Sequence, residues 1–209
     1  MRLWIPSVVM VIACCATAAY GEPVCKPTSV IATHNYPGAA SIPSTNNLIQ
    51  PTGKAVAVAG QQLIIQGRVL DMRCAPVREA VVELWQNSPT GRWLLAGDAD
   101  LASANPVFAG AGRTYTDGDG NFMFITAFPA PLGNNAPYVS LRIRAEAVPD
   151  MSTALYFSDD TRNAKDTKYS KLASNVRSDT TIAMQQGDDD TLLGTIQLVI
   201  PAKAPFRTY

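Results

Sequence analysis

The chain has 209 residues and a single histidine, His34. Ser-His-Asp and Cys-His nucleophilic sites need an imidazole base beside the nucleophile. His34 lies in a stretch rich in Pro, Ser, Thr and Asn, where we expect it to face solvent or to bond within a loop. The sequence has no Walker A motif and no dinucleotide-binding fingerprint. We therefore expect neither nucleophilic catalysis through histidine nor nucleotide binding.

Two acidic segments could attract a cation, but neither has a complete set of ligands. Asp117–Asn121 (DGDGN) begins like an EF-hand loop. Phe122 and Phe128 occupy the sixth and twelfth positions, where that loop needs Gly and Glu. We predict a hairpin turn there instead. The run Asp188–Asp190 is typical of a solvated loop, so no metal site is expected from either segment.

Residues 1–21 have the pattern of a secretory signal peptide. Arg2 supplies positive charge, Leu3–Ala13 is mostly apolar, and Ala16-Thr17-Ala18 and Ala19-Tyr20-Gly21 are candidate cleavage sites. The apolar run is shorter than the ~20 residues that a membrane-spanning helix needs. We expect export to the periplasm or the outer membrane, with cleavage near residue 21.

Two alternatives remain for this N-terminus. Val11-Ile12-Ala13-Cys14 resembles a bacterial lipobox, and cleavage there would leave a lipid on Cys14 that anchors the protein to a membrane face. The same apolar residues could instead form an N-terminal strand of a cytosolic protein.

Cleavage near residue 21 leaves two cysteines, Cys25 and Cys74. An even number of cysteines in an oxidising compartment indicates a disulfide, which would tie the N-terminal segment to the first hairpin of the core. The loop-entropy argument gives such a bond about 4 kcal/mol. The alternative is two buried free thiols, because cysteine packs readily as a small hydrophobe.

The composition is that of one globular domain without an excess of charge. Lys and Arg number 17, as do Asp and Glu, and zero net charge argues against nucleic-acid binding. Residues 22–60 predict an extended N-terminal arm, and residues 61–209 the domain itself. Short apolar runs separated by turns indicate an all-β fold, an antiparallel β-sandwich with little helix.

Six strands and one short helix are predicted within the domain. We expect Leu95–Arg113 to be irregular and a helix around Tyr169–Val176. Arg142 and Arg144 alternate with apolar residues; they could face an anion, although a solvent-facing edge is the commoner explanation. The predicted strands are Gln62–Leu70 (with a bulge at Gly67), Ala80–Gln86, Asn121–Thr126, Tyr138–Ala147, Ala154–Phe157 and Thr195–Ile200.

Five motifs, taken together, resemble one known family. They are Gly67–Asp71, Val82–Gln86, Phe108–Arg113, Thr116–Gly120 and Leu155–Phe157. This set resembles the core of the intradiol ring-cleavage dioxygenases, typified by protocatechuate 3,4-dioxygenase, over most of the predicted domain. The resemblance implies the same β-sandwich and an active site in which two tyrosines and two histidines hold Fe(III).

The residues that match the family's iron ligands are of other types. By their place in the motifs, Trp93 occupies the position of the first tyrosine ligand and Leu132 that of the second. Tyr138 and Ser140 stand for the His-x-His pair, and Asn135 for the active-site arginine. Indole and leucine side chains offer no atom that ligates iron. The resemblance thus implies a degenerate member without Fe(III) or another cofactor, in which Tyr138 fills core space.

These patterns predict a non-catalytic, exported, dioxygenase-like protein that acts as a structural or interaction component. Its partners would be other proteins in a homo- or hetero-oligomeric envelope assembly, such as a secretion complex, with Glu22–Lys54 and Pro201–Tyr209 as docking segments. One alternative is a non-catalytic subunit of an active dioxygenase, and another is an active intradiol enzyme. A third is a small-molecule binder whose vacated pocket is lined by Trp85, Trp93 and Tyr138.

Overall fold

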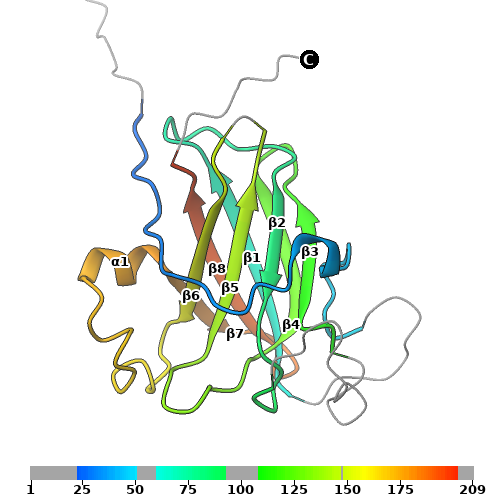
Figure 1. Ribbon diagram of the computed structural model, residues 1–209, viewed down its shortest axis with the longest axis vertical. Coiled ribbons are helices and arrows are strands. Elements are labelled where there is room, and N and C mark those ends of the chain that lie inside the picture. The colour runs from blue at the N-terminus through cyan, green and yellow to red at the C-terminus, as the bar shows by residue number, and fades with distance from the viewer. Residues whose placement is uncertain (1–22, 51–59, 93–107, 147, 202–209) are drawn as a thin grey trace, which may run out of the picture.

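The computed structural model describes residues 23–50, 60–92, 108–146 and 148–201. The predicted signal peptide, the lipid site at Cys14, Trp93 and residues 202–209 lie outside these ranges. Within them the chain forms a β-rich domain (Figure 1). Its elements are η1 (Ala39–Ser41), β1 (Gln62–Leu70), β2 (Val81–Trp85), β3 (Ala111–Tyr115), β4 (Asn121–Ala127), β5 (Tyr138–Arg144), β6 (Met151–Phe157), α1 (Ser174–Asp179), β7 (Thr181–Gln186) and β8 (Leu192–Val199).

The strands follow the order β3-β2-β5-β6-β7-β8-β1-β4 and fold into two facing layers (Figure 1). Five of the pairings are antiparallel, whereas β1 with β8 and β6 with β7 are parallel. The predicted β-sandwich with little helix is thus confirmed, although its strands are not all antiparallel. The core between the layers contains Leu63 and Ile65 of β1, Leu84 of β2, and Leu141 of β5, all fully buried.

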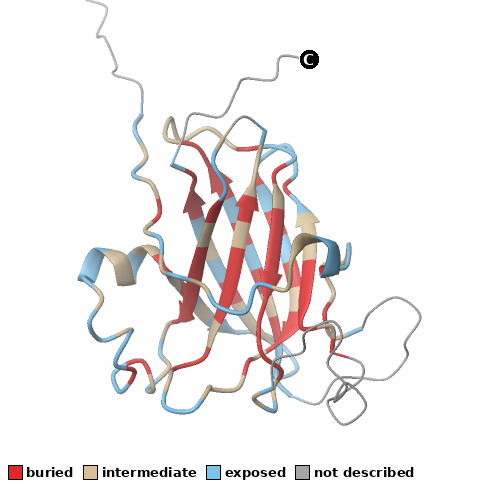
Figure 2. Ribbon diagram, viewed as in Figure 1, coloured by how far each residue is buried: buried red, intermediate tan, exposed pale blue. Residues whose placement is uncertain are grey.

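The two layers differ in what covers their outer faces (Figure 2). In β1 and β4, buried residues alternate with exposed ones, as expected for a sheet with one face in water. In β2 and β6, burial is almost continuous along the strand. The layer β3-β2-β5-β6 is therefore covered on its outer face as well.

The cover is the predicted N-terminal arm, which crosses the outer face of β6, β5, β2 and β3 (Figure 1). The arm bonds to each part of the domain in turn. The Thr28 N–H donates to the Val199 carbonyl at 3.0 Å, and the Ala154 N–H donates to the Ile31 carbonyl at 3.3 Å. Farther along, the Trp85 indole N–H donates to the His34 carbonyl at 2.9 Å.

The same arm then closes the gap between the edge strands β3 and β4. The Ile125 N–H donates to the Asn46 carbonyl at 2.8 Å, and the Ala109 N–H donates to the Leu48 carbonyl at 2.9 Å. The Leu48 side chain is fully buried. Unpaired strand edges invite pairing with other chains, and the arm occupies these two. Residues 23–50 thus pack on their own domain in this structure, and their role as a docking segment stays a prediction.

Two strands are not among those predicted from the sequence: β3, which begins in the segment predicted to be irregular, and β7. β3 (AGRTY) has few residues that favour strands, and its pairing with β2, Val82 opposite Thr114 for example, fixes it as one. β7 is similarly held between β6 and β8. The Asp117–Gly120 turn leads from β3 in one layer to β4 in the other, so the hairpin predicted there is wrong.

Gly67 lies in unbroken register with both β4 and β8, so the predicted bulge is also wrong. A Cβ at Gly67 would meet the Cζ atom of Phe122 at 2.1 Å. The glycine is therefore required for the close approach of an aromatic ring to the strand backbone.

Candidate functional site

The two positions predicted to match the family's histidines lie on the covered outer face. Tyr138 and Ser140 alternate along β5 with Val139 and Leu141, which point into the core. In the register of the sheet, Ser140 lies between Trp85 of β2 and Ala154 of β6. The candidate site is therefore the part of this face that the arm shields.

Ser140 is a poor candidate for a metal ligand. Its side chain is fully buried, and among the described residues its Oγ atom has no hydrogen-bond partner. The residues opposite it, Trp85 and Ala154, bring an indole ring and a methyl group. A lone hydroxyl in such surroundings is a poor ligand for Fe(III), for which the family supplies imidazole and phenolate.

Tyr138 belongs to a row of three tyrosines. Its ring centroid lies 5.9 Å from that of Tyr156, which lies 4.8 Å from that of Tyr169. The buried carboxylate of Asp166 accepts hydrogen bonds from the backbone N–H groups of Ala136 at 2.7 Å and Tyr169 at 3.0 Å. The row thereby packs between the start of β5 and the loop that precedes α1.

This environment favours the protonated form of Tyr138 and Tyr156. Burial, and then the charge of Asp166, raise the pKa of Tyr138. The same causes raise the pKa of Tyr156 from 10.0 to about 12. An iron ligand would have to be a phenolate, so the surroundings of Tyr138 oppose that state. Its half-buried ring packs in a cluster with Tyr156 and Tyr169.

Two other predicted positions, Leu132 and Asn135, lie in the loop between β4 and β5. The Asn135 N–H donates to the Leu132 carbonyl at 3.1 Å, which closes a turn, and both side chains are half-buried. Trp93 lies outside the described residues. The structure therefore brings Tyr138 and Ser140 onto one face and places Leu132 and Asn135 in the loop before them.

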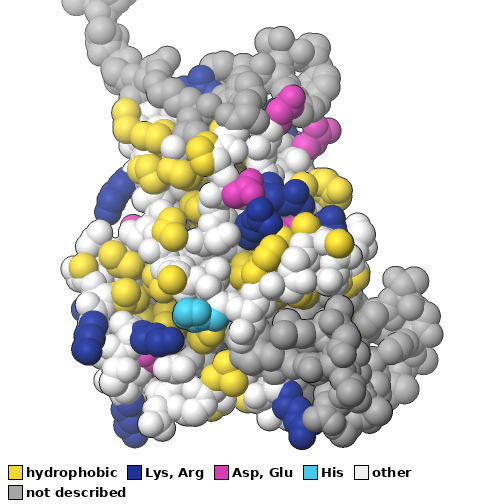
Figure 3. Space-filling model, in the orientation of Figure 1, with side chains coloured by type: hydrophobic (Ala, Val, Ile, Leu, Met, Phe, Trp, Pro, Cys, Tyr) yellow, Lys and Arg dark blue, Asp and Glu magenta, His cyan; other side chains and the backbone are white. Residues whose placement is uncertain are grey.

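A buried ionic network next to Ser140 was not anticipated from the sequence. Glu83 of β2 is fully buried on the same face. Its Oε1 atom lies 2.9 Å from Arg144 Nη2, and its Oε2 atom lies 3.7 Å from Arg142 Nη1. β5 is a central strand, so the prediction that these arginines mark a solvent-facing edge is wrong. Figure 3 shows basic and acidic side chains grouped on this face.

The arm completes this network through Tyr36. The Tyr36 hydroxyl donates to Glu83 Oε2 at 3.0 Å and accepts a hydrogen bond from Arg142 Nη1 at 2.6 Å. Its ring meets that of Trp85 edge-on at 5.1 Å between centroids. Burial, followed by the hydrogen bond to Glu83, raises the pKa of Tyr36. Alternation along β2 does place Glu83 beside Trp85, but it does not reveal that an arm covers both.

Other candidate cation sites are structural. His34 is exposed, and its backbone carbonyl binds the Trp85 indole. The Asp117 carboxylate accepts the N–H groups of Asp119 and Asn121, which shapes the turn. Throughout the described ranges, His, Cys, Asp and Glu side chains nowhere gather in a group of three that could hold a metal ion.

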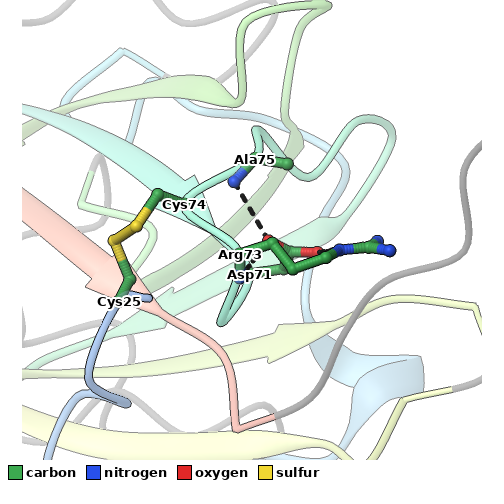
Figure 4. The surroundings of a disulfide bond; sticks show 5 residues. All are labelled: Cys25, Asp71, Arg73, Cys74 and Ala75. Carbon is green, nitrogen blue, oxygen red and sulfur yellow. Dashed lines mark hydrogen bonds and ion pairs between the residues drawn. A yellow bond between two sulfur atoms is a disulfide. The ribbon is translucent and has the colours of Figure 1, made fainter. Parts of the chain in front are cut away.

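The predicted disulfide between Cys25 and Cys74 is present (Figure 4). The Cα atoms lie 5.2 Å apart, and the bond joins the start of the arm to the turn after β1. The buried Asp71 carboxylate accepts the N–H groups of Arg73 at 2.8 Å and Ala75 at 3.0 Å, which fixes that turn. The arm is thus covalently joined to the turn between β1 and β2, two strands that do not pair with each other, so the predicted first hairpin is not formed.

The fold and the family agree with the resemblance seen in the sequence. The dioxygenase family model matches residues 36–192, most of the chain. The chain belongs to the intradiol dioxygenase family. It is 41% identical over 78 residues to the protocatechuate 3,4-dioxygenase beta chain of Burkholderia cepacia, which covers 36% of this chain and 33% of that one. A dioxygenase-family relative from Rickettsia conorii is 30% identical over 123 residues, 56% of this chain and 59% of its own.

Solved structures show the same fold at lower identity. The dioxygenase domain of a dioxygenase carbohydrate-binding fusion from Streptomyces sp. SirexAA-E has a TM-score of 0.66 and 20% identity, covering 85% of this chain and all of that one. An intradiol ring-cleavage dioxygenase from Tetranychus urticae has a TM-score of 0.66 and 18% identity, covering 87% and 98%. The chain spans between one third and three fifths of the curated relatives' length. None of the described helices is long and apolar enough to cross a membrane.

Proposed function

We propose that this chain is a non-catalytic, exported member of the intradiol dioxygenase family that serves as a structural component of an envelope assembly. The observation that carries the proposal is the covered face of β5. Ser140 is fully buried, and its hydroxyl has no hydrogen-bond partner in the part of the chain that the structure describes; Tyr138 is a phenol whose raised pKa opposes ionisation. With one histidine in the sequence, no imidazole pair is available. The residues present do not fit Fe(III), and no reaction step is assigned to it.

Oxygen uptake tests the lack of catalysis. The purified protein, incubated with ferrous and then ferric iron, is mixed with catechol or protocatechuate in an oxygen electrode. An iron-containing intradiol dioxygenase serves as the positive control, and buffer with the same iron as the blank. We expect uptake no faster than the blank. Uptake more than about tenfold above the blank, with formation of a ring-cleaved product, would contradict the proposal.

The open outer face is the surface that we assign to a partner protein. The arm covers one layer, whereas the outer face of β8, β1 and β4 carries an open groove of about 730 Å³. Its lining includes Gln66, Tyr115, Met123 and Gln197. Tyr115 is 57% exposed and Met123 is 37% exposed, and exposed aromatic and methionine side chains are enriched in interfaces.

Affinity purification from the envelope of the native host tests this assignment. We expect one protein to be recovered at a stoichiometric level with the wild type. The variant Met123→Lys should lower its recovery by about tenfold, because a charge would be desolvated in the interface. Gln185→Lys, on the exposed part of β7, is the matched control and should have no effect. Recovery of a lone monomer from the wild type would refute the proposal.

Export is tested by mass spectrometry of the mature protein. A polypeptide that begins near residue 22 supports cleavage by a signal peptidase. A lipid-modified N-terminus at Cys14 supports the membrane-anchored alternative. An uncleaved chain in the cytoplasm would contradict the export part of the proposal.

One relative favours a second candidate function. The identity of 41% over 78 residues to a protocatechuate 3,4-dioxygenase beta chain supports a role as a non-catalytic subunit of an active dioxygenase. In that case the protein recovered with the wild type would be an iron-containing family member with intact tyrosine and histidine ligands.

A small-molecule binder is less well supported, because Ser140 is fully buried under the arm and offers no open pocket.

A further inference from the structure

We propose that the disulfide between Cys25 and Cys74 is a redox-sensitive lock on the N-terminal arm. Its reduction frees the first part of the arm and uncovers the face of the sheet that carries Trp85, Glu83 and Ser140. This inference concerns the arm alone and does not depend on whether the protein is catalytic.

The two halves of the lock differ in how firmly they are held. Cys74 lies in a turn that is fixed without the disulfide (Figure 4). Its N–H donates to the Asp71 carbonyl at 2.9 Å, and the Asp71 N–H donates to the Ala75 carbonyl at 2.9 Å. Cys25 has one backbone hydrogen bond, to the Met72 carbonyl at 3.0 Å, and its neighbour Val24 is 81% exposed. Reduction would therefore leave the turn in place and release the arm.

The arm beyond Cys25 is held mainly by hydrogen bonds, which include those of Tyr36 to Glu83 and Arg142. Thr28 exchanges two hydrogen bonds with Val199, and Ile31 bonds to Thr153 and Ala154. No residue from 32 to 41 is buried. Such a segment, with few buried apolar contacts, belongs to the parts of a protein that open locally at low cost.

The far end of the arm is anchored much more strongly. Ile42 is 2% exposed and packs on Trp85 and Ala111, and Leu48 is fully buried in the main core. The arm therefore remains attached at residues 42–48 when its first part is released. The motion is a local opening that starts at Cys25 and ends at Ile42.

Opening would expose groups that the arm now keeps from water. Trp85 is 2% exposed, and its indole N–H bonds to the arm. Glu83 is fully buried, and Tyr36 of the arm is one of its hydrogen-bond partners. Removal of the arm thus leaves an aromatic ring and a carboxylate with its arginines on an accessible face. This is a second surface, distinct from the open groove on β8, β1 and β4.

The reaction requires a dithiol reductant. Both cysteines are half-buried, so neither end of the bond is enclosed in the core. A thiolate of the dithiol attacks one sulfur of the Cys25–Cys74 bond and forms a mixed disulfide. Its second thiol then displaces the protein thiolate. Cys25 and Cys74 gain two electrons and two protons, and the dithiol becomes a disulfide.

Hydrogen exchange measured by NMR tests the lock on the purified protein with and without excess dithiothreitol. The reporters are the Trp85 indole N–H, which donates to His34, and the Ala154 N–H, which donates to Ile31. We expect reduction to accelerate their exchange by about tenfold or more. The internal control is the Ile65 amide in the middle of β1, which should change by less than about twofold.

A variant separates the lock from other effects of the reductant. In Cys25→Ser/Cys74→Ser, the reporters should exchange at the fast rate with or without dithiothreitol, which excludes a contribution from Cys14 and Cys15. Unchanged exchange of the reporters on reduction of the wild type would overturn the proposal. Equal acceleration at Ile65 would also overturn it, because the bond would then stabilise the whole domain and not the arm.

Discussion

Replacing Glu83 by glutamine probes the buried network that joins the arm to the sheet. The variant Glu83→Gln keeps the shape of the side chain and removes its charge. Arg142 and Arg144 then face an amide in place of a carboxylate, and one Gln N–H group must meet another donor. We expect loss of stability together with weaker attachment of Tyr36.

The magnitude follows from burial on each side of the network. Glu83 is fully buried, and removal of one partner of a buried ion pair costs about 3–5 kcal/mol. The side chains of Arg142 and Arg144 are 24% and 32% exposed, so water compensates part of their lost pairing. We therefore expect Glu83→Gln to lower the free energy of unfolding by about 2–4 kcal/mol.

Urea unfolding of the oxidised protein measures this change as a shift in midpoint at constant slope. The matched control is Asp188→Asn, an acid-to-amide change at an exposed turn, which should alter stability by less than about 0.5 kcal/mol. The effect of Glu83→Gln should persist at about 1 M salt, because buried pairs are little screened. A change as small as that of the control would refute the view that this network holds the arm.

Three further substitutions test other parts of the structure. Because the pKa of Tyr156 is raised from 10.0 to about 12, the folded state keeps this proton after the unfolded state has lost it. Stability should thus fall by about 2 kcal/mol between those pH values, and Tyr156→Phe should flatten the decline in alkaline urea titrations. Ser140→Ala removes a buried hydroxyl that has no partner among the described residues, so thermal unfolding should show equal stability or a gain of about 1 kcal/mol. A loss of more than about 1 kcal/mol would instead indicate that the hydroxyl is bonded. Gly67→Ala should cost about 1–3 kcal/mol through collision with Phe122, whereas Gly118→Ala, with nothing within 4 Å, should not; equal urea midpoints would contradict the packing at Gly67.

The strands of the core could be predicted from sequence because their apolar residues alternate clearly. Gln62–Leu70 and Tyr138–Arg144 both carry an apolar residue at nearly every second position, and both are strands. β3 could not be found in this way, because Ala111–Tyr115 has little intrinsic preference for a strand and its pairing with β2 decides its conformation. The two parallel pairings also depend on long-range topology, which no local pattern records.

The sequence pointed to residues for the candidate site, but it could not give their environment. The motifs placed Tyr138 and Ser140 at the positions of the family's histidines, and alternation put them on one face of β5. What covers that face depends on an arm that bonds largely through its own backbone N–H and carbonyl groups, which any sequence can offer. Glu83 illustrates the limit, since a single glutamate between valine and leucine gives no sign of two arginines and a tyrosine around it.

The most direct test of the central claim is the iron content of the purified protein after loading with Fe(III), read together with its visible absorption spectrum. We expect far less than about one iron per chain and no tyrosinate-to-iron charge-transfer band, because the residues at the predicted ligand positions lack the imidazole groups that the family uses to bind Fe(III). Iron near one per chain, accompanied by that band, would contradict it.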